Sequence, residues 1–487
     1  MSRILFASSE AYPLIKTGGL ADVAGSLPRA LLSLKQDIRL ILPAYPEARK
    51  RLGKCKTIAR FELDGHNINL LQGRLPGSRV ITWLIDCATF FDRPGNPYMN
   101  EQGQVWPDNA ERFAFFSQAI CAIATDQVGL DWQAELVHCN DWQTALVPAL
   151  LDQETRRPAT LFTVHNLAYQ GLFDYDIFVT LGLPPHLWHP DALEFYNQLS
   201  FIKGGLVFAD SINTVSPSYA EEIQRPEFGY GLDGLLRHRR QQLSGILNGI
   251  DMDEWNPGTD PRLEQNYNRR SLAKKLINKT ALQEYFKLPK KPEALLFGFI
   301  GRLVEQKGLD DILASLPGML DGPVQFVFLG SGQHEYEQAL RKLAVQQPDK
   351  IAVQIGYSEE LSHRIEAGAD AFLMPSTFEP CGLNQLYSLR YGTLPVVRKV
   401  GGLNDTVIDI HPENLDNDSA TGIVFTGAAD DGLPEAIQRT LQLYQNKTRW
   451  KQVQLAAMRQ DFSWRRSAQI YLELYKTSLE RNPKPSN

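Results

Sequence analysis

The sequence predicts an α/β protein made of two doubly wound, Rossmann-like domains. In the first half of the chain, short and nearly continuous apolar runs alternate with amphipathic segments. The alternation breaks near residue 250 and is followed by a second series of the same kind. Apolar strands separated by helices are typical of a parallel sheet that is covered on both faces. A length of 487 residues suits two or three domains, each with its own core.

The first series of segments predicts the sheet and helices of an N-terminal domain. Its expected strands are residues 4–8, 38–42, 80–85, 136–139, 161–165 and 211–215. Its expected helices are residues 22–34, 108–125 and 142–151. The strands are rich in β-branched and aromatic residues, and the helical segments have the longer period of an amphipathic helix.

A polar stretch rich in Asn, Asp, Pro and Gly follows, at residues 248–270, and predicts a linker region. The second series then gives strands at 295–300, 325–329, 352–355, 371–374 and 395–397, with helices at 308–316 and 335–343. The tail from 462 to 479 reads as one long amphipathic helix. We therefore expect domains at residues 1–247 and 248–461, followed by a helix at about 462–480.

Composition excludes several classes of protein. The net charge is −6 with Lys and Arg spread along the chain, which argues against a nucleic-acid-binding surface. Five scattered cysteines without a Cys-x-x-Cys pair predict neither a disulfide framework nor a zinc site, and they fit a reducing compartment. The longest apolar runs have strand length, and no signal-peptide pattern opens the chain. We expect a cytoplasmic protein that does not span a membrane.

The segment from Lys16 to Asp22, Lys-Thr-Gly-Gly-Leu-Ala-Asp, is the most informative in the chain. It links the first expected strand to the first expected helix. Glycines such as Gly18 and Gly19 let backbone N–H groups approach a phosphate, the helix N-terminus adds partial positive charge, and Lys16 adds a full one. A plain strand-to-helix turn is the alternative. The spacing matches neither common phosphate loop, so the segment carries family information.

Two strand-end loops of the second half supply further charged groups. Arg302 and Lys307 lie five residues apart between a strand and a helix, an arrangement that suits a pyrophosphate leaving group. Glu379 precedes a Pro-Cys-Gly turn, after which the amides of Gly382 and Leu383 could bind a phosphate. Solvated surface charges, and a helix-capping carboxylate for Glu379, are the alternatives.

In the first half, Asp141 and His165 lie at the ends of two expected strands, and a purely structural role is the alternative for the histidine. Carboxyl ends of parallel strands meet at one sheet edge, where open α/β proteins bind ligands. An Asp charge and a His donor beside a sugar would suit a reaction that develops positive charge at carbon and negative charge on the leaving group.

Other motifs carry less weight. Short Asp-x-Asp patterns arise by chance, the His pair lacks a third ligand, and the Gly-Ser-Gly segment lacks the third glycine of a dinucleotide fingerprint. These motifs are Asp251-Met252-Asp253, Asp174-Tyr175-Asp176, His186 with His189, and Gly330-Ser331-Gly332.

With these residues in view, the chain resembles bacterial glycogen synthases and plant starch synthases along nearly its whole length. The resemblance is carried by the Lys16 loop, residues 92–98 (Asp-Arg-Pro-Gly-Asn-Pro-Tyr), residues 163–171 around His165, the Arg302/Lys307 loop, and residues 379–383. It implies the GT-B architecture, two Rossmann-like domains facing across a deep cleft. It also implies retaining transfer of glucose from ADP-glucose to the non-reducing end of an α-1,4-glucan such as glycogen or starch, with no metal and no other cofactor.

The resemblance also assigns residues to roles. Glu379, His165, Asp141, Arg302, Lys307 and Lys16 would serve catalysis. Donor binding would use Lys16, Gly18, Gly19, Arg302, Lys307, Tyr357 near the adenine, Cys381, Gly382, Leu383 and Asn384. Tyr98, Asn166, Asn248 and Asp22 would border the sugar or acceptor. The C-terminal helix would pack on the first domain.

Some alternatives stay open from sequence. Many relatives carry Thr where this chain has Asn384, and Tyr387 stands where a wider group of transferases has a second glutamate, so no ribose-binding role transfers to it. A relative using UDP-glucose or another acceptor, and an inactive glucan-binding scaffold, remain rival readings. A pyridoxal-phosphate phosphorylase is disfavoured because no cofactor-lysine motif is identifiable. The oligomeric state is left undetermined.

Overall fold

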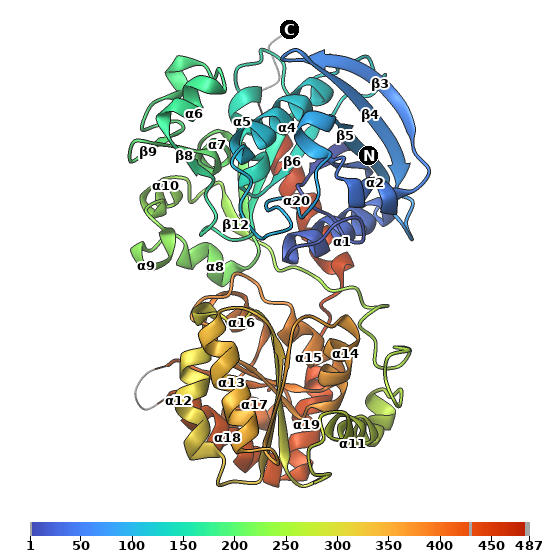
Figure 1. The fold of residues 1–487 in the computed structure, drawn as a ribbon, viewed down its shortest axis with the longest axis vertical. Helices are drawn as coiled ribbons and strands as arrows, with labels where there is room; N and C mark the ends of the chain where they lie inside the picture. Colours follow the sequence, from blue (N-terminus) through green and yellow to red (C-terminus); the bar gives the residue numbers. More distant parts are fainter. Residues whose placement is uncertain (1, 428–430, 483–487) are drawn as a thin grey trace. The chain divides into compact units, whose positions relative to one another are not determined.

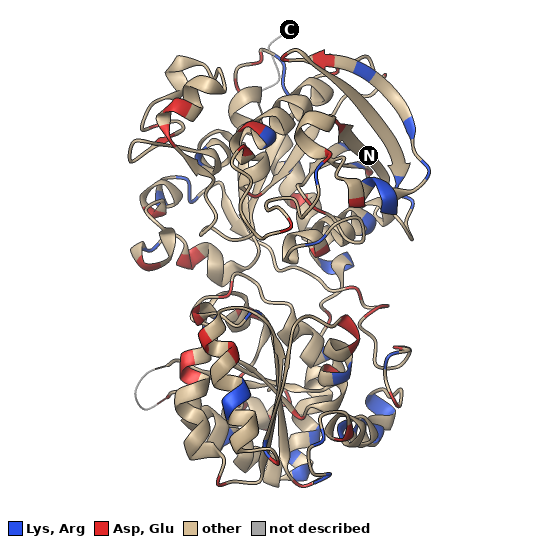
Figure 2. Ribbon diagram, viewed as in Figure 1, with Lys and Arg blue, Asp and Glu red and all other residues tan. Residues whose placement is uncertain are grey.

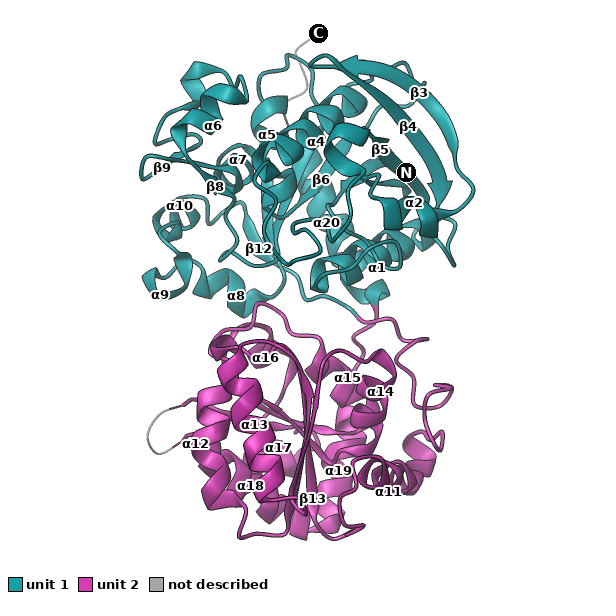
Figure 3. Ribbon diagram, viewed as in Figure 1, with its two compact units in different colours: residues 1–249, 464–487 teal, residues 250–463 magenta. Residues whose placement is uncertain are grey.

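The computed structural model describes residues 2–427 and 431–482. It divides into two compact units, residues 1–249 with 464–487 and residues 250–463 (Figure 3). The division falls two residues from the domain boundaries expected from the sequence. Each unit is an α/β layer structure, so the predicted fold class is confirmed. Lys and Arg are interspersed with Asp and Glu over both units (Figure 2).

Unit 1 is built on a nine-stranded sheet (Figure 1). In spatial order its strands are β12 (Leu243–Gly245), β11 (Ser211–Thr214), β7 (Ala159–Val164), β6 (Leu136–Asn140), β1 (Arg3–Ala7), β2 (Asp37–Pro43), β5 (Ile81–Asp86), β4 (His66–Arg74) and β3 (Lys56–Leu63). The strands from β12 to β5 are parallel, and the central ones are buried on both faces. A small sheet adds β8 (Leu172–Phe173), β10 (Gln198–Ser200) and β9 (Glu194–Phe195).

The edge hairpin β3–β4 was not predicted, and it adds two antiparallel strand pairings to the parallel sheet expected from the sequence. Strand β4 pairs antiparallel with both β3 and β5. The turn between β3 and β4 is Asp64-Gly65, both with positive φ (49° and 74°). An Asp-Gly pair between alternating segments is a strong hairpin signal, because a type I′ turn needs positive φ at both positions. The signal was therefore present in the sequence.

Helices cover both faces of the unit 1 sheet. Helices α4 (Asn109–Ala124), α5 (Leu146–Leu151) and α7 (Phe201–Phe208) pack together on one face, and α1 (Gly19–Ser33) and α20 (Trp464–Arg481) on the other (Figure 1). The remaining helices are short: α2 (Pro46–Leu52), α3 (Ala88–Phe91), α6 (Tyr175–Thr180), α8 (Pro217–Glu222), α9 (Pro226–Gly229) and α10 (Asp233–His238). No helix of the described residues is long and apolar enough to cross a membrane.

The C-terminal helix α20 is fixed to the unit 1 sheet by buried polar contacts. The Tyr475 hydroxyl lies 2.9 Å from His138 Nδ1. The other ring nitrogen of His138, Nε2, lies 2.7 Å from Thr163 Oγ1. The side-chain Nδ2 of Asn213 donates to the Tyr471 hydroxyl at 2.8 Å. Burial holds the pKa of His138 well below its usual range, so its ring is neutral. His138 is a buried residue of β6, and its contacts hold α20 against the sheet.

Replacing Tyr475 by Phe should therefore destabilise the protein. The change leaves a buried ring nitrogen of His138 without its partner, which costs about 1–3 kcal/mol. The free energy of unfolding from a denaturant titration measures the effect. The matched control is Tyr285→Phe, whose hydroxyl is exposed and bonds Gln354; it should change stability by less than about 0.5 kcal/mol. Equal effects of the two changes would contradict this role for His138.

Unit 2 contains a fully parallel six-stranded sheet. In spatial order its strands are β15 (Ile351–Ile355), β14 (Val324–Gly330), β13 (Leu295–Ile300), β16 (Ala371–Met374), β17 (Leu394–Arg398) and β18 (Ile423–Phe425). Figure 1 shows α12 (Leu309–Met319), α13 (His334–Gln346) and α18 (Leu433–Gln445) on one face. The other face carries α11 (Lys275–Tyr285), α14 (Glu359–Gly368), α15 (Asn384–Tyr391) and α19 (Lys447–Ala457). Two short helices, α16 (Gly401–Thr406) and α17 (Pro412–Asp416), complete the unit.

The stretch predicted as a linker is in fact an ordered part of unit 2. Ile250, Trp255 and Tyr267 are buried and share a hydrophobic cluster with Tyr391 of α15. The Tyr267 hydroxyl donates to the carbonyl of Tyr391 at 2.8 Å. The sequence did not predict this packing, because the stretch is mostly polar and only a few of its apolar side chains are buried.

Candidate active site

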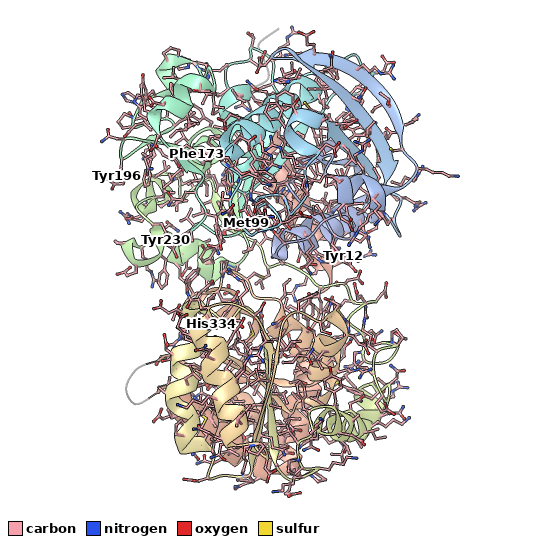
Figure 4. All side chains as sticks on the ribbon, viewed as in Figure 1. Tyr12, Met99, Phe173, Tyr196, Tyr230 and His334 are labelled. Atoms are coloured by element: carbon pink, nitrogen blue, oxygen red, sulfur yellow. The ribbon has the colours of Figure 1, made fainter. Side chains whose placement is uncertain are left out.

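The Lys16 loop lies between β1 and α1, as expected, and its glycines are left open. Gly18 is the N-cap of α1 with extended backbone (φ −156°), and no side chain caps the helix. Apart from the adjoining residues and the backbone of the same helix, no heavy atom of the described part of the chain lies within 4 Å of a Cβ built on Gly18 or Gly19. Their own packing does not require glycine, which is consistent with space for a bound group. Lys16 forms an ion pair with Asp22 (2.8 Å) and lies over the ring of Tyr12, which Figure 4 labels.

Glu10 fixes this loop, and the sequence reading missed it. Its carboxylate accepts hydrogen bonds from the Thr17 amide (2.5 Å), the Thr17 hydroxyl (2.8 Å) and the Gly18 amide (3.3 Å). The Tyr98 hydroxyl donates to the same carboxylate at 3.0 Å and lies 2.8 Å from Ser9 Oγ. Glu10 is only 3% exposed, and burial raises the pKa of its carboxyl. The sequence signal was an acidic residue a few positions after the end of a buried strand, β1.

Removing the Glu10 side chain should release the loop. Glu10→Ala removes every acceptor that holds the Thr17 and Gly18 amides, so their hydrogen exchange should accelerate by at least about tenfold. Glu10→Gln is the matched control, because one amide oxygen can still accept from both backbone amides while the hydroxyls of Thr17 and Tyr98 reorient. Hydrogen exchange followed by mass spectrometry separates the two variants. Unchanged exchange in Glu10→Ala would refute this role.

Asp141 and His165 are brought together at the ends of β6 and β7. Asp141 Oδ1 accepts the His165 amide at 2.7 Å, and the Asn166 amide also bonds this carboxylate. Burial raises the pKa of Asp141 to about 7. Its φ of 56° lies in the left-handed region that favours glycine, a strain of the kind that clusters at functional sites.

His165 differs from the expected donor in one respect. Asn140 Nδ2 donates to the carbonyls of Ala7 and His138, which fixes the Asn140 amide oxygen as an acceptor. His165 Nε2, 3.0 Å from that oxygen, must then carry the proton. Burial lowers the pKa of His165 to about 3, so the ring is neutral and its Nδ1 is an acceptor. The ring N–H expected to serve a sugar is already used by Asn140.

Asn248 is the remaining unit 1 residue assigned by resemblance. It follows β12, is 7% exposed, and its amide oxygen has no hydrogen-bond partner among the described residues. A buried polar atom without a partner costs free energy, so this oxygen is a natural acceptor for a ligand hydroxyl.

In unit 2, the loops after β13 and β16 meet. Lys307 Nζ lies 2.5 Å from Glu379 Oε2, and Ser376 Oγ donates to the same oxygen at 3.0 Å. The loops are joined by hydrogen bonds of Gln306 with the backbone of Thr377 and Phe378. Glu379 is 8% exposed, so Lys307 neutralises a nearly buried carboxylate.

Arg302 and Lys307 contact different side chains in this structure: Lys307 pairs with Glu379, and Arg302 bonds Gln306. Arg302 Nη2 donates to Gln306 Oε1 at 3.3 Å, and the Arg302 side chain is exposed. Gly308, the N-cap of α12, has φ +72°, and a Cβ there would lie 2.3 Å from the Pro375 carbonyl oxygen. The close approach of the two loops therefore requires a glycine at 308.

The turn after Glu379 is held by a second glycine pair that the sequence reading missed. The Gly402 amide donates to the Glu379 carbonyl at 3.1 Å, and a Cβ at Gly402 would lie 2.2 Å from the Cys381 carbonyl oxygen. The sequence signal was present, since residues 399–405 (Lys-Val-Gly-Gly-Leu-Asn-Asp) repeat the Lys-x-Gly-Gly-Leu-x-Asp pattern of residues 16–22.

The other predicted donor residues flank this turn. Cys381 is buried, Gly382 has φ +71°, and Leu383 is the N-cap of α15. Asn384 Nδ2 donates to the Ile300 carbonyl at 2.8 Å and so ties α15 to the end of β13. Tyr357 lies just before α14, with 74% of its surface exposed.

Comparison with known proteins identifies the family. Residues 3–238 match the starch synthase catalytic domain, and residues 282–454 match glycosyl transferases group 1. The chain is 58% identical to a glycogen synthase of Cellvibrio japonicus over 98% of this chain and 99% of the relative. The chain belongs to the glycogen synthase family. It is 56% identical to glycogen synthase 1 of Methylococcus capsulatus over 98% of this chain and 97% of that relative.

A solved structure agrees with this family assignment. The catalytic domain of starch synthase IV from Arabidopsis thaliana, bound to ADP and acarbose, superposes with a TM-score of 0.87 at 32% identity and covers 98% of this chain and 99% of that one. The chain is thus an enzyme of the glycogen synthase family with the GT-B fold, as the sequence predicted. The roles of individual residues stay predictions.

Proposed function

We propose that this glycogen synthase family member transfers glucose from ADP-glucose to the non-reducing end of an α-1,4-glucan, with retention of configuration. The observation that carries the proposal is the Lys307–Glu379 pair at 2.5 Å, at the carboxyl edge of the unit 2 sheet. It supplies a cation for a departing diphosphate and a carboxylate for the transferred sugar. The relative solved with ADP and acarbose supports the nucleotide and the glucan-like acceptor.

The charged residues define the chemistry. Lys307 and Arg302 would stabilise the negative charge on the leaving diphosphate, so the transfer step itself needs no metal. The amides of Gly382 and Leu383, in the same unit as Lys307 and Arg302, would add hydrogen bonds to phosphate. Asp141, ionised above about pH 7, would face the positive charge that develops on the sugar.

Retention requires either a covalent glucosyl-enzyme or attack from the face of the leaving group. The carboxylates of Glu379 and Glu10 are each held by several hydrogen bonds or an ion pair, and Asp141 by backbone amides. Groups held in this way orient and stabilise rather than attack, so we favour attack from the leaving-group face. Detection of a glucosyl-enzyme by mass spectrometry would overturn this part of the proposal.

A donor-competition assay tests the proposal. The purified protein is given a maltooligosaccharide with ADP-glucose, UDP-glucose or both, and release of each nucleotide is followed. We expect ADP release with chain elongation and a much lower kcat/KM for UDP-glucose. Preference for UDP-glucose would support the rival donor. Glucan binding without nucleotide release, unchanged in Glu379→Ala, would support an inactive scaffold.

A further inference from the structure

A cluster of titratable residues in unit 2 is not used by the proposed reaction. It forms where the stretch after residue 250 packs against α14 and α15. The ring of Trp255 stacks on His363 of α14 (centroids 3.7 Å apart, 11° between planes) and on Tyr387 of α15 (3.6 Å, 10°). This packing places Glu254, the neighbour of Trp255, beside His363 and Glu359.

His363 is held by one ring nitrogen and presents the other. Nδ1 lies 2.7 Å from Asp260 Oδ2, and both side chains are fully buried. The Tyr391 hydroxyl donates to the same Asp260 oxygen at 2.7 Å, so Asp260 is an ionised acceptor and Nδ1 its donor. His363 Nε2 is buried and has no hydrogen-bond partner among the residues described. Its nearest carboxylate oxygen is Glu359 Oε1, at 3.6 Å.

The geometry is that of a cation site. His363 Nε2 and one carboxylate oxygen each of Glu254 and Glu359 lie within 4.8 Å of one another. Tetrahedral ligands about 2.1 Å from a metal are separated by about 3.4 Å, so small side-chain rotations would close the site. A histidine whose second nitrogen donates to a carboxylate, here Asp260, is the usual supporting arrangement of a metal-bound imidazole.

The local charge favours a divalent ion. Asp260, Glu254 and Glu359 are three carboxylates, and Arg262 pairs with Glu254 (3.3 Å) and Asp260 (3.6 Å). Three negative charges and one positive charge leave a net charge of two negative units on the carboxylates and guanidinium around the His363 ring. Nitrogen and carboxylate ligands together suit a transition-metal dication such as Zn²⁺ better than Mg²⁺ or Ca²⁺.

We propose that Glu254, Glu359 and His363 bind a divalent transition-metal ion, oriented by Asp260. None of the three is among the residues assigned to glucose transfer, so the proposal stands apart from the proposed function. The neighbouring Asp-x-Asp motif is not part of it: Asp251 Oδ1 accepts the amides of Asp253 and Glu254, which directs the chain so that Glu254 reaches the cluster. The site would tie the stretch after residue 250 to α14.

Metal titration of the full chain tests the proposal. The chain carries Cys55→Ser to remove an exposed thiol that would bind the probe, is freed of metal with a chelator, and is titrated with Co²⁺. Bound cobalt is read by absorption and by the shift in the thermal unfolding midpoint. We expect saturable binding of a single ion, with affinity lowered at least about tenfold in Glu254→Gln and in Glu359→Gln. These glutamates are only partly buried, so the variants should fold.

Controls decide between the outcomes. Glu360→Gln, on the same turn of α14 but paired with Arg364, should bind cobalt as the parent chain does. His363→Gln should abolish binding; its fold is checked by circular dichroism, and the two glutamate variants decide the matter if it fails to fold. Absence of binding in the parent chain, or equal binding in the Glu254 and Glu359 variants, would overturn the proposal. His363 would then be an imidazolium between Asp260 and Glu359.

Discussion

Lys307→Ala should lower kcat by about 100- to 1000-fold, because it removes a positive charge at the proposed leaving group. It should also lower the free energy of unfolding by roughly 1–3 kcal/mol, because the nearly buried Glu379 loses its ion-pair partner. Steady-state kinetics and denaturant titration measure the two effects separately.

Two variants separate the roles of Lys307. Arg302→Ala should lower kcat in a similar way with little change in stability, because the Arg302 side chain is exposed and bonds only weakly to Gln306. Adding Glu379→Gln to Lys307→Ala should restore much of the lost stability and none of the activity. Full activity in Lys307→Ala would contradict the proposed role, and unchanged stability would contradict the importance of the ion pair.

Asp141→Asn should produce a protein that is more stable at high pH and at least about 100-fold less active. In the folded protein the pKa of Asp141 is about 7, above its usual value of 3.8. Between these values the folded state holds a proton that the unfolded state has released, so stability falls as pH rises through this window. Asparagine cannot ionise, has nearly the shape of aspartate, and keeps an oxygen for the His165 amide.

The pH dependence identifies the cause. Above pH 7 the Asp141→Asn variant should exceed the parent chain by on the order of 1–3 kcal/mol in free energy of unfolding, and below pH 4 the gain should vanish. Unfolding measured at both pH values tests this. If the variant and the parent chain differ by the same free energy of unfolding above pH 7 and below pH 4, ionisation of Asp141 does not cause the difference.

The sequence was sufficient for the parallel parts of both sheets, because buried parallel strands are continuous apolar runs between helices. The sequence was insufficient for segments that bury only one face or only a few isolated side chains. No residue of strand β3 is fully buried, and its apolar residues are interspersed with polar ones, so the Asp64-Gly65 turn was the clearest mark of the hairpin. The stretch after residue 250 packs through isolated aromatic residues such as Trp255, which polar neighbours concealed.

The site shows the same division. Residues in distinctive motifs, such as Lys16 and Glu379, were predicted from the sequence, and the structure places them in the loops that follow β1 and β16. Glu10 was missed because its role depends on hydrogen bonds to residues seven and 88 positions away, and spacing alone does not reveal such partners. The tautomer of His165 likewise follows from the orientation of the Asn140 amide, which only the folded chain fixes.

The structure of the reaction product tests whether the protein transfers glucose from ADP-glucose to the non-reducing end of an α-1,4-glucan with retention. The protein is incubated with ADP-glucose labelled with carbon-13 in the glucose and an unlabelled maltooligosaccharide, and the product is examined by NMR. We expect labelled glucose in an α-1,4 linkage at the non-reducing end, with release of ADP. A β linkage, label at the reducing end, or free labelled glucose without elongation would contradict it.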